Sequence, residues 1–190
     1  MIEITCHNPA VPVHAALLRG INIGPHQRIA MADLLALVTD LGHTSVETYV
    51  QSGNVVFQSR SRSTAALAAG IERAIAETLG LTVAVVVRSG PELAAIVAGL
   101  PFGDRGADDR QLHVAFLSDE PDPGATAALD ASALAPDELR IAGRDVYLHY
   151  PSGAGRSKLS NAFLERSLGV VSTSRNWRTV NALADLTAKA

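Results

Sequence analysis

The sequence predicts an α+β protein made of two ferredoxin-like βαββαβ units in tandem, with antiparallel sheets and helices on one face. Residues 14–88 follow the order strand, helix, hairpin, helix, strand, as judged by hydrophobic periods of 2 and 3.6. The same order recurs in residues 89–190, where Val146–Leu148 stands in the place of Val55–Phe57. Because sequence identity between the halves is slight, a single larger mixed sheet remains an alternative.

Length and composition allow one large domain or two small ones. The 190 residues are 47% hydrophobic, which is enough to bury a core and excludes a disordered chain. Only 4% are aromatic, so we expect a core of Ala, Val, Leu and Ile.

In the first half, residues 14–18 are apolar on both faces and predict a central strand covered on two sides. Apolar residues at helical spacing predict a helix over 31–41, closed by Gly42. Alternating residues 46–50 and 55–57 flank a Gln-Ser-Gly-Asn turn and predict a β-hairpin. A helix over 67–79 and a strand over 83–87 complete the unit.

The second half opens with a capping box at Ser89–Glu92, which predicts a helix up to Leu100. Residues 102–110 are rich in Asp and Gly and predict a loop. The remaining expected elements are a strand at 112–117, an alanine-rich helix near 125–134, a hairpin of 139–141 with 145–150, a helix at 159–168, a strand at 170–174 and a final helix at 179–190.

Residues 1–13 show neither period and contain two prolines, so we expect an N-terminal extension. This segment is too polar for a secretory signal, and no apolar run reaches the length of a membrane span. Cys6 is the single cysteine, which excludes an internal disulfide and fits a reducing compartment. We therefore expect a soluble, cytoplasmic protein without membrane association, either a monomer or a homodimer.

Charge is distributed unevenly along the chain. The net charge of −3 excludes a generally basic nucleic-acid-binding protein. Residues 89–139 hold ten acidic side chains against two basic ones, whereas residues 140–178 hold seven basic against two acidic. The two blocks either face each other or solvent, or the basic block attracts an anionic ligand.

Five motifs, taken together, resemble the family catalogued as domain of unknown function 1697. The resemblance runs from about His14 to the C-terminus and implies a small, soluble, bacterial-type α+β protein with no established activity and no catalytic residues to carry over. The family pattern has a lysine-bearing stretch after the first motif, where this chain has Pro25–Arg28, so a role for that lysine passes to Arg28 or is absent. The motifs are Ala16–Gly24, Thr48–Phe57, Val146–Pro151, Gly155–Leu159 and Thr173–Trp177.

The polar residues of these motifs are the candidate ligand site. If equivalent loops of the two halves meet, their guanidinium and amide donors suit a phosphate or carboxylate, and backbone N–H groups at the start of the helix after Lys158 could join them. The alternative is structural: Asn and Ser bond their own turns, Arg19 pairs with a carboxylate, and Ser157 or Ser160 caps a helix. The predicted ligand-binding residues are Arg19, Asn22, Gln51, Asn54, Arg156, Lys158, Arg175 and Asn176, with Ser52 and Ser157 beside them.

Two other functions remain open. Trp177, between Asn176 and Arg178, could stack on a base of single-stranded nucleic acid, although a core position is favoured for it. The chain could also be a non-catalytic module that associates with a second copy. We write no reaction for Ser52 or Ser157 as nucleophiles, and the spacing of the histidines predicts no metal site and no cofactor.

Overall fold

The computed structural model describes residues 11–24, 27–102 and 108–189. Most of the predicted N-terminal extension, with Cys6, lies outside these residues, as do residues 103–107 of the predicted acidic loop. The described chain forms two antiparallel sheets of four strands each, which confirms the two-sheet prediction and rules out the single mixed sheet.

The first unit has the strand order β2-β3-β1-β4, with β1 in the interior of the sheet. One helix, α3, follows the βαββαβ series. The elements are β1 (Val13–Leu18), α1 (Met31–Asp40), β2 (Thr44–Tyr49), β3 (Asn54–Gln58), α2 (Thr64–Leu79), β4 (Val85–Ser89) and α3 (Gly90–Ala98).

The second unit repeats this arrangement with the order β6-β7-β5-β8, and it too ends in an added helix, α6. The elements are β5 (Leu112–Leu117), α4 (Pro123–Ala128), η2 (Ala131–Leu134), β6 (Glu138–Ala142), β7 (Asp145–His149), η3 (Ala154–Arg156), α5 (Asn161–Leu168), β8 (Ser172–Asn176) and α6 (Trp177–Lys189).

Two details of the second half differ from the prediction. The helix expected near 125–134 is two pieces, because the chain leaves helical geometry at Leu129 and the Asp130 carboxylate caps η2 instead. The last strand extends to Asn176, and α6 starts at Trp177, since Asn176 Oδ1 accepts the hydrogen bond of Thr179 N–H as a helix N-cap.

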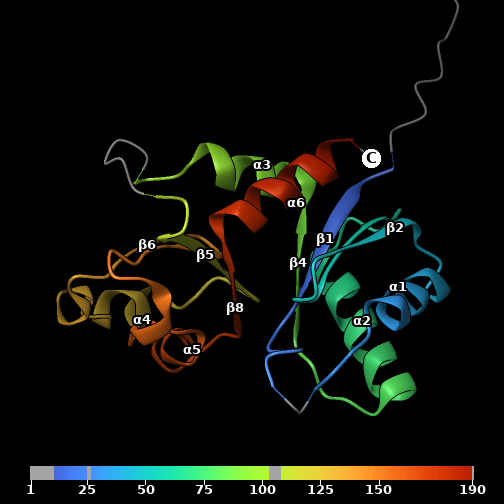
Figure 1. Cartoon of the computed structure of the whole chain (residues 1–190), viewed down its shortest axis with the longest axis horizontal. Coiled ribbons are helices and arrows are strands. Elements are labelled where there is room, and N and C mark those ends of the chain that lie inside the picture. The colour runs from blue at the N-terminus through green and yellow to red at the C-terminus, as the bar shows by residue number, and fades with distance from the viewer. Residues whose placement is uncertain (1–10, 25–26, 103–107, 190) are drawn as a thin grey trace, which may run out of the picture.

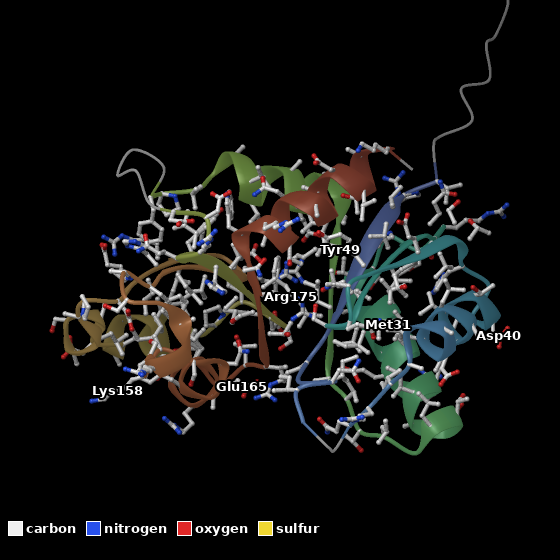
Figure 2. The ribbon with its side chains drawn as sticks, viewed as in Figure 1. Met31, Asp40, Tyr49, Lys158, Glu165 and Arg175 are labelled. Carbon is white, nitrogen blue, oxygen red and sulfur yellow. The ribbon has the colours of Figure 1, made fainter. Side chains whose placement is uncertain are left out.

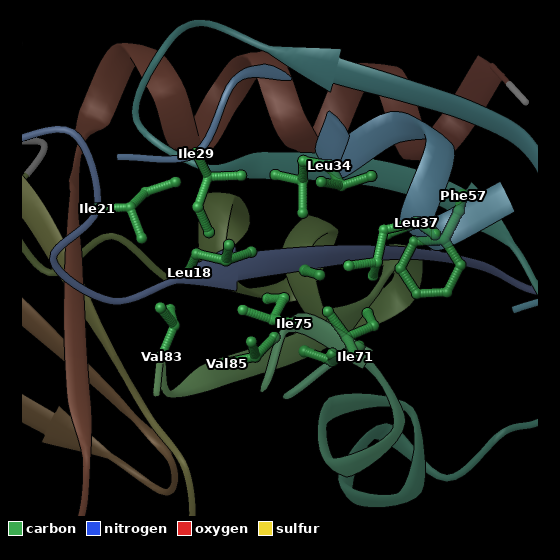
Figure 3. Close-up of a cluster of buried hydrophobic side chains, with 14 of the residues drawn as sticks. Leu18, Ile21, Ile29, Leu34, Leu37, Phe57, Ile71, Ile75, Val83 and Val85 are labelled. Carbon is green, nitrogen blue, oxygen red and sulfur yellow. The ribbon is translucent and has the colours of Figure 1, made fainter. Parts of the chain in front are cut away.

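Helices cover both faces of the sheets. Figure 1 shows α1 and α2 on the outer side of the first sheet, α4 and α5 beside the second, and α3 against α6 between the two units. Figure 3 shows the core under α1 and α2, in which Leu18, Phe57 and Ile71 are fully buried. The prediction of helices on one face therefore describes each βαββαβ series, while α3 and α6 cover the opposite, inner faces.

The inner faces share one core. Ala15 and Leu17 of β1 point to this side, whereas Ala16 and Leu18 point to the outer core, as the period of a strand requires. Residues of both units and both added helices meet in this cluster: Val56, Val86, Leu93, Ile96, Val114, Phe116, Tyr147, Trp177, Val180 and Leu183. The shared core packs the two units into one body.

Two buried arginines join the units in equivalent ways. Arg88, the fourth residue of β4, donates from Nη2 to Leu117 O at 2.8 Å and Arg144 O at 2.7 Å, and from Nε to Asp145 Oδ1 at 3.1 Å. Arg175 is the fourth residue of β8 and makes equivalent bonds from the second unit to the first unit. Each arginine thus binds the last carbonyl of the other unit's central strand and the turn of that unit's hairpin, β6–β7 for Arg88 and β2–β3 for Arg175.

The edge strands β4 and β8 are each capped by a glutamate in the same way. The first N–H of each strand, at Val85 and Ser172, donates to a helix carboxylate, Glu72 at 2.8 Å and Glu165 at 3.0 Å respectively. At the other end, Ser89 forms the predicted capping box with Glu92. These side chains occupy the backbone groups through which an open edge would pair with another chain.

We expect Arg88→Met to destabilise the protein by about 3–5 kcal/mol, because it leaves two carbonyls and the largely buried Asp145 without their partner. The double variant Arg88→Met/Asp145→Asn removes the unpaired charge and should recover part of the loss. Urea unfolding of both variants measures this. A single variant within about 0.5 kcal/mol of the wild type would contradict the bridging role.

We expect stability to fall as the pH drops below the ordinary histidine pKa near 6.5, because burial lowers the pKa of His14, His43 and His113. The unfolded chain then binds protons that the folded chain excludes. His14 is 1% exposed and packs with His43 around Phe57. His14→Leu should reduce the difference in melting temperature between about pH 7.5 and about pH 5.5. An unchanged difference would refute this.

Candidate functional site

The first two motifs meet at one end of the first sheet. The Asn22 amide donates to Ile29 O at 3.0 Å and to Gln51 O at 2.9 Å, and its oxygen accepts from Ile29 N–H at 3.1 Å. Asn22 has a positive φ of 57°, which asparagine tolerates better than most residues. Its side chain therefore closes the loop after β1 and ties it to the β2–β3 turn.

Arg175 enters this turn from the second unit, near the centre of the molecule in Figure 2. Its Nη2 donates to Leu18 O at 2.9 Å, Ser52 O at 3.1 Å and Gly53 O at 3.3 Å, while Nε donates to Asn54 Oδ1 at 2.5 Å. Nη1 donates to Thr173 Oγ1 and Ser174 O, both at 2.9 Å. Every guanidinium nitrogen is thus engaged by the protein.

Arg175 differs from Arg88 in its acid partner. Where Arg88 meets the Asp145 carboxylate, Arg175 meets the neutral amide of Asn54. Desolvation lowers the pKa of Arg175 to about 10, and the side chain remains charged at neutral pH. Within the described residues the charge is held by carbonyl, amide and hydroxyl oxygens, without a carboxylate.

Arg19 forms a third link between the units. Its Nε and Nη2 donate to the two carboxylate oxygens of Glu165, each at 2.6 Å. This hydrogen bond is the main reason that the pKa of Arg19 is raised. Burial favours a higher pKa for Glu165, but the bonds from Arg19 and Ser172 N–H outweigh it and the pKa is lowered. The pair is partly exposed, with 35% of the Arg19 side chain accessible.

The predicted ligand-binding residues thus fall into separate groups. Arg19, Asn54 and Arg175 lie at the contact of the two units, Asn22 lies in the loop after β1, and all four donate hydrogen bonds within the protein. Gln51 lies exposed on the same turn, where its carbonyl holds Asn22. Asn176 caps α6.

Arg156 and Lys158 lie elsewhere, on the loop between β7 and α5, and both are exposed. Figure 2 places Lys158 far from Arg175. Neither cation has a salt-bridge or side-chain hydrogen-bond partner in the described part of the chain. They line a cavity of about 330 Å³ together with the segment Ala133–Asp137.

The Asp137 carboxylate links the two walls of this cavity. Its Oδ2 accepts the hydrogen bond of Ser157 Oγ at 2.5 Å, and Ser157 Oγ accepts from Leu159 N–H at 2.9 Å. Ser157 is therefore held in place by a carboxylate and a backbone amide. Ser160 caps α5, as the structural alternative for these serines predicts.

The remaining candidates have structural positions. Ser52 Oγ accepts from the Asn54 amide at 2.9 Å inside the hairpin turn. Trp177 is 7% exposed in the core between the units and offers no free face for a base. Among the described residues, no group of three or more His, Cys, Asp or Glu side chains is placed to hold a metal ion. The helices described in the structure include none long and apolar enough to cross a membrane.

Comparison with known proteins places the chain in a family. A family model described as "Protein of unknown function (DUF1697)" matches residues 11–147. The chain belongs to this family. The match covers the first two motifs and only Val146 and Tyr147 of the third, and it ends before the loop that carries Arg156 and Lys158.

The fold of this chain is similar to that of a solved structure, conserved bacterial protein SP0830 from Streptococcus pneumoniae. The alignment covers 94% of this chain and 99% of that one, with a TM-score of 0.71 and 24% identity. At this identity the likeness shows the fold alone. The comparison with curated proteins gives no match.

Sequence reasoning missed Arg88 and Asp137. The sequence pattern places Arg88 only at the end of the valine-rich strand predicted over residues 83–87. The signal that identifies Arg88 is its position as the fourth residue of β4, which is equivalent to that of Arg175 in β8. Asp137 gave no signal, because it lies in an acidic loop segment and meets Ser157 only in the folded protein.

We expect Gly53→Ala to destabilise the protein by about 1–3 kcal/mol more than Gly80→Ala. Both glycines have positive φ, 74° and 66°, so both variants carry the same backbone strain. A Cβ at Gly53 would lie 2.7 Å from Ile21 Cδ1 and 2.9 Å from Leu18 Cβ, whereas Gly80 has open space. Denaturant unfolding compares them, and equal losses would show that the turn can absorb the methyl group.

Proposed function

We propose that this protein binds a small anionic ligand, phosphorylated or carboxylated, in the cavity at Arg156 and Lys158. The observation that carries the proposal is that these two cations, alone among the basic residues predicted for the site, lack a protein partner in the described chain. A guanidinium and an ammonium group that line one cavity suit a phosphate, which accepts several charge-assisted hydrogen bonds.

The dimensions of the cavity support the proposal. Its volume of about 330 Å³ is at the lower end of the range usual for small-molecule sites, about 300–1,000 Å³. The lining carries two basic side chains, Arg156 and Lys158, against the one carboxylate of Asp137, and an excess of positive charge raises the local concentration of anions.

The site at the contact of the units supports ligand binding less well. Arg19 and Arg175 are occupied by Glu165 and by backbone carbonyls. A ligand there would have to replace these bonds, and removal of Arg175 from its partners would leave buried carbonyls unpaired, which costs about 1–3 kcal/mol for each group.

The proposal predicts a thermal shift with phosphate-containing compounds. At a ligand concentration about 100 times the Kd, binding stabilises the folded state by about 2.7 kcal/mol and raises the Tm by about 5–10 °C. Arg156→Ala/Lys158→Ala should abolish the shift. Arg73→Ala, an exposed arginine on α2, is the matched control and should retain it.

The screen should include inorganic phosphate, sugar phosphates, nucleotides, carboxylates and short single-stranded DNA and RNA at two salt concentrations. A shift that persists in the double variant would place the ligand elsewhere. The absence of any shift would refute anion binding, and light scattering at high protein concentration would then test self-association.

A further inference from the structure

The cavity at Arg156 and Lys158 has two walls of different charge. Both cations come from the segment Ser152–Lys158, whereas the segment Ala133–Asp137 contributes one carboxylate, Asp137. The bond from Ser157 Oγ to Asp137 Oδ2 joins the two segments. A ligand in this cavity therefore meets an anion-binding wall and a hydrogen-bond-accepting wall.

Asp137 keeps one oxygen for a ligand. Its Oδ2 accepts from Ser157, whereas Oδ1 has no hydrogen-bond partner within residues 11–24, 27–102 and 108–189. A carboxylate accepts hydrogen bonds only, so the matching ligand group must be a donor, a hydroxyl or an amine. Ser152, which is exposed and also lines the cavity, can donate to or accept from a second hydroxyl.

The charge balance selects between a hydroxyl and an amine. Two cations against one carboxylate leave the cavity with one excess positive charge. An amino acid zwitterion carries no net charge and would leave that excess unneutralised, and an amine on a phosphate monoester would add a third cation to a cavity that already holds two. A phosphate monoester carries about −1.5 to −2 charges at neutral pH, and a hydroxyl on the same molecule can donate to Asp137.

The cavity lining disfavours a nucleotide. Its apolar surface comes from small aliphatic residues such as Ala133, Leu134 and Pro136, and none of the described lining residues is aromatic. Recognition of a base usually relies on stacking with an aromatic ring or a guanidinium plane, and the guanidinium of this lining, that of Arg156, is assigned to the phosphate. The lining instead suits a compact polyol carbon chain.

We propose that the ligand class is the hydroxylated phosphate monoesters, such as sugar phosphates and glycerol phosphate, a proposal that rests on the anion-binding function proposed above. Arg156 and Lys158 hold the phosphate, and Asp137 Oδ1 accepts the hydrogen bond of a ligand hydroxyl. Ser157 orients the carboxylate by occupying its other oxygen.

Calorimetric titration of the full chain with inorganic phosphate, propyl phosphate, glycerol 1-phosphate, ribose 5-phosphate and adenosine monophosphate tests this. Glycerol 1-phosphate should bind about tenfold more tightly than propyl phosphate, which lacks the hydroxyls, because a hydrogen bond to a charged acceptor is made only by the former. Ribose 5-phosphate should bind more tightly than adenosine monophosphate.

Asp137→Asn should remove most of this tenfold preference while inorganic phosphate binds as tightly as before, or more tightly because a negative charge is gone. Arg156→Ala/Lys158→Ala should abolish binding of every phosphate, and Arg73→Ala should change none. The comparison of propyl phosphate with glycerol 1-phosphate needs only the wild type, so it decides the matter even if the Asp137 variant does not fold.

The outcomes separate the two proposals. If the wild type binds no phosphate compound, anion binding itself is refuted. If phosphate binds through Arg156 and Lys158 but glycerol 1-phosphate shows no advantage, the ligand class is wrong and anion binding stands. If Asp137→Asn keeps that advantage, the assignment of Asp137 as the acceptor of the ligand hydroxyl is overturned. Tighter binding of adenosine monophosphate would also overturn the sugar phosphate assignment.

Discussion

The fold depends on two buried arginines that each cross from one unit to the other. Arg88 and Arg175 end in the interior, where a charged group is stable only if its donors are satisfied, and both find carbonyl oxygens at the ends of the opposite central strands. The hydrogen bonds of each arginine also hold the hairpin turn of the other unit, β6–β7 for Arg88 and β2–β3 for Arg175. The hairpins of the two units are therefore positioned by residues of the other unit, and either unit alone would lack these contacts.

Equivalence between the units extends to their edges and added helices. Glu72 and Glu165 cap the first N–H of β4 and β8, and α3 packs against α6 as the last element of each unit. The equivalence is broken at two points: Asn54 stands where Asp145 would be expected, and Arg19 adds an ion pair to Glu165 for which no counterpart is present at Glu72 within the described residues. The Arg19–Glu165 ion pair ties α5 of the second unit to the first unit.

Some polar residues of the motifs are bonded within the protein and others are free, and this difference bears on function. Arg19, Asn54 and Arg175 hold the two units together, so their presence in the motifs of this chain is explained by architecture without any ligand. Arg156 and Lys158 lie outside the matched residues and outside the contact between units. Arg19 and Arg175 donate their hydrogen bonds within the protein, whereas Arg156 and Lys158 have no such partners within the described residues and are available for a ligand.

The sequence by itself determined the element order, both faces of the central strands, the capping box at Ser89 and the glycine of the hairpin turn. These follow from local period and backbone conformation, which neighbouring residues specify. The sequence also predicted the eight polar residues of the candidate ligand site. Only the tertiary structure decided which were free, because their partners are remote: Arg175 binds a carbonyl 157 residues away, and Arg19 a carboxylate 146 residues away. Local sequence sets conformation, whereas hydrogen-bond satisfaction depends on which distant segments the core brings together.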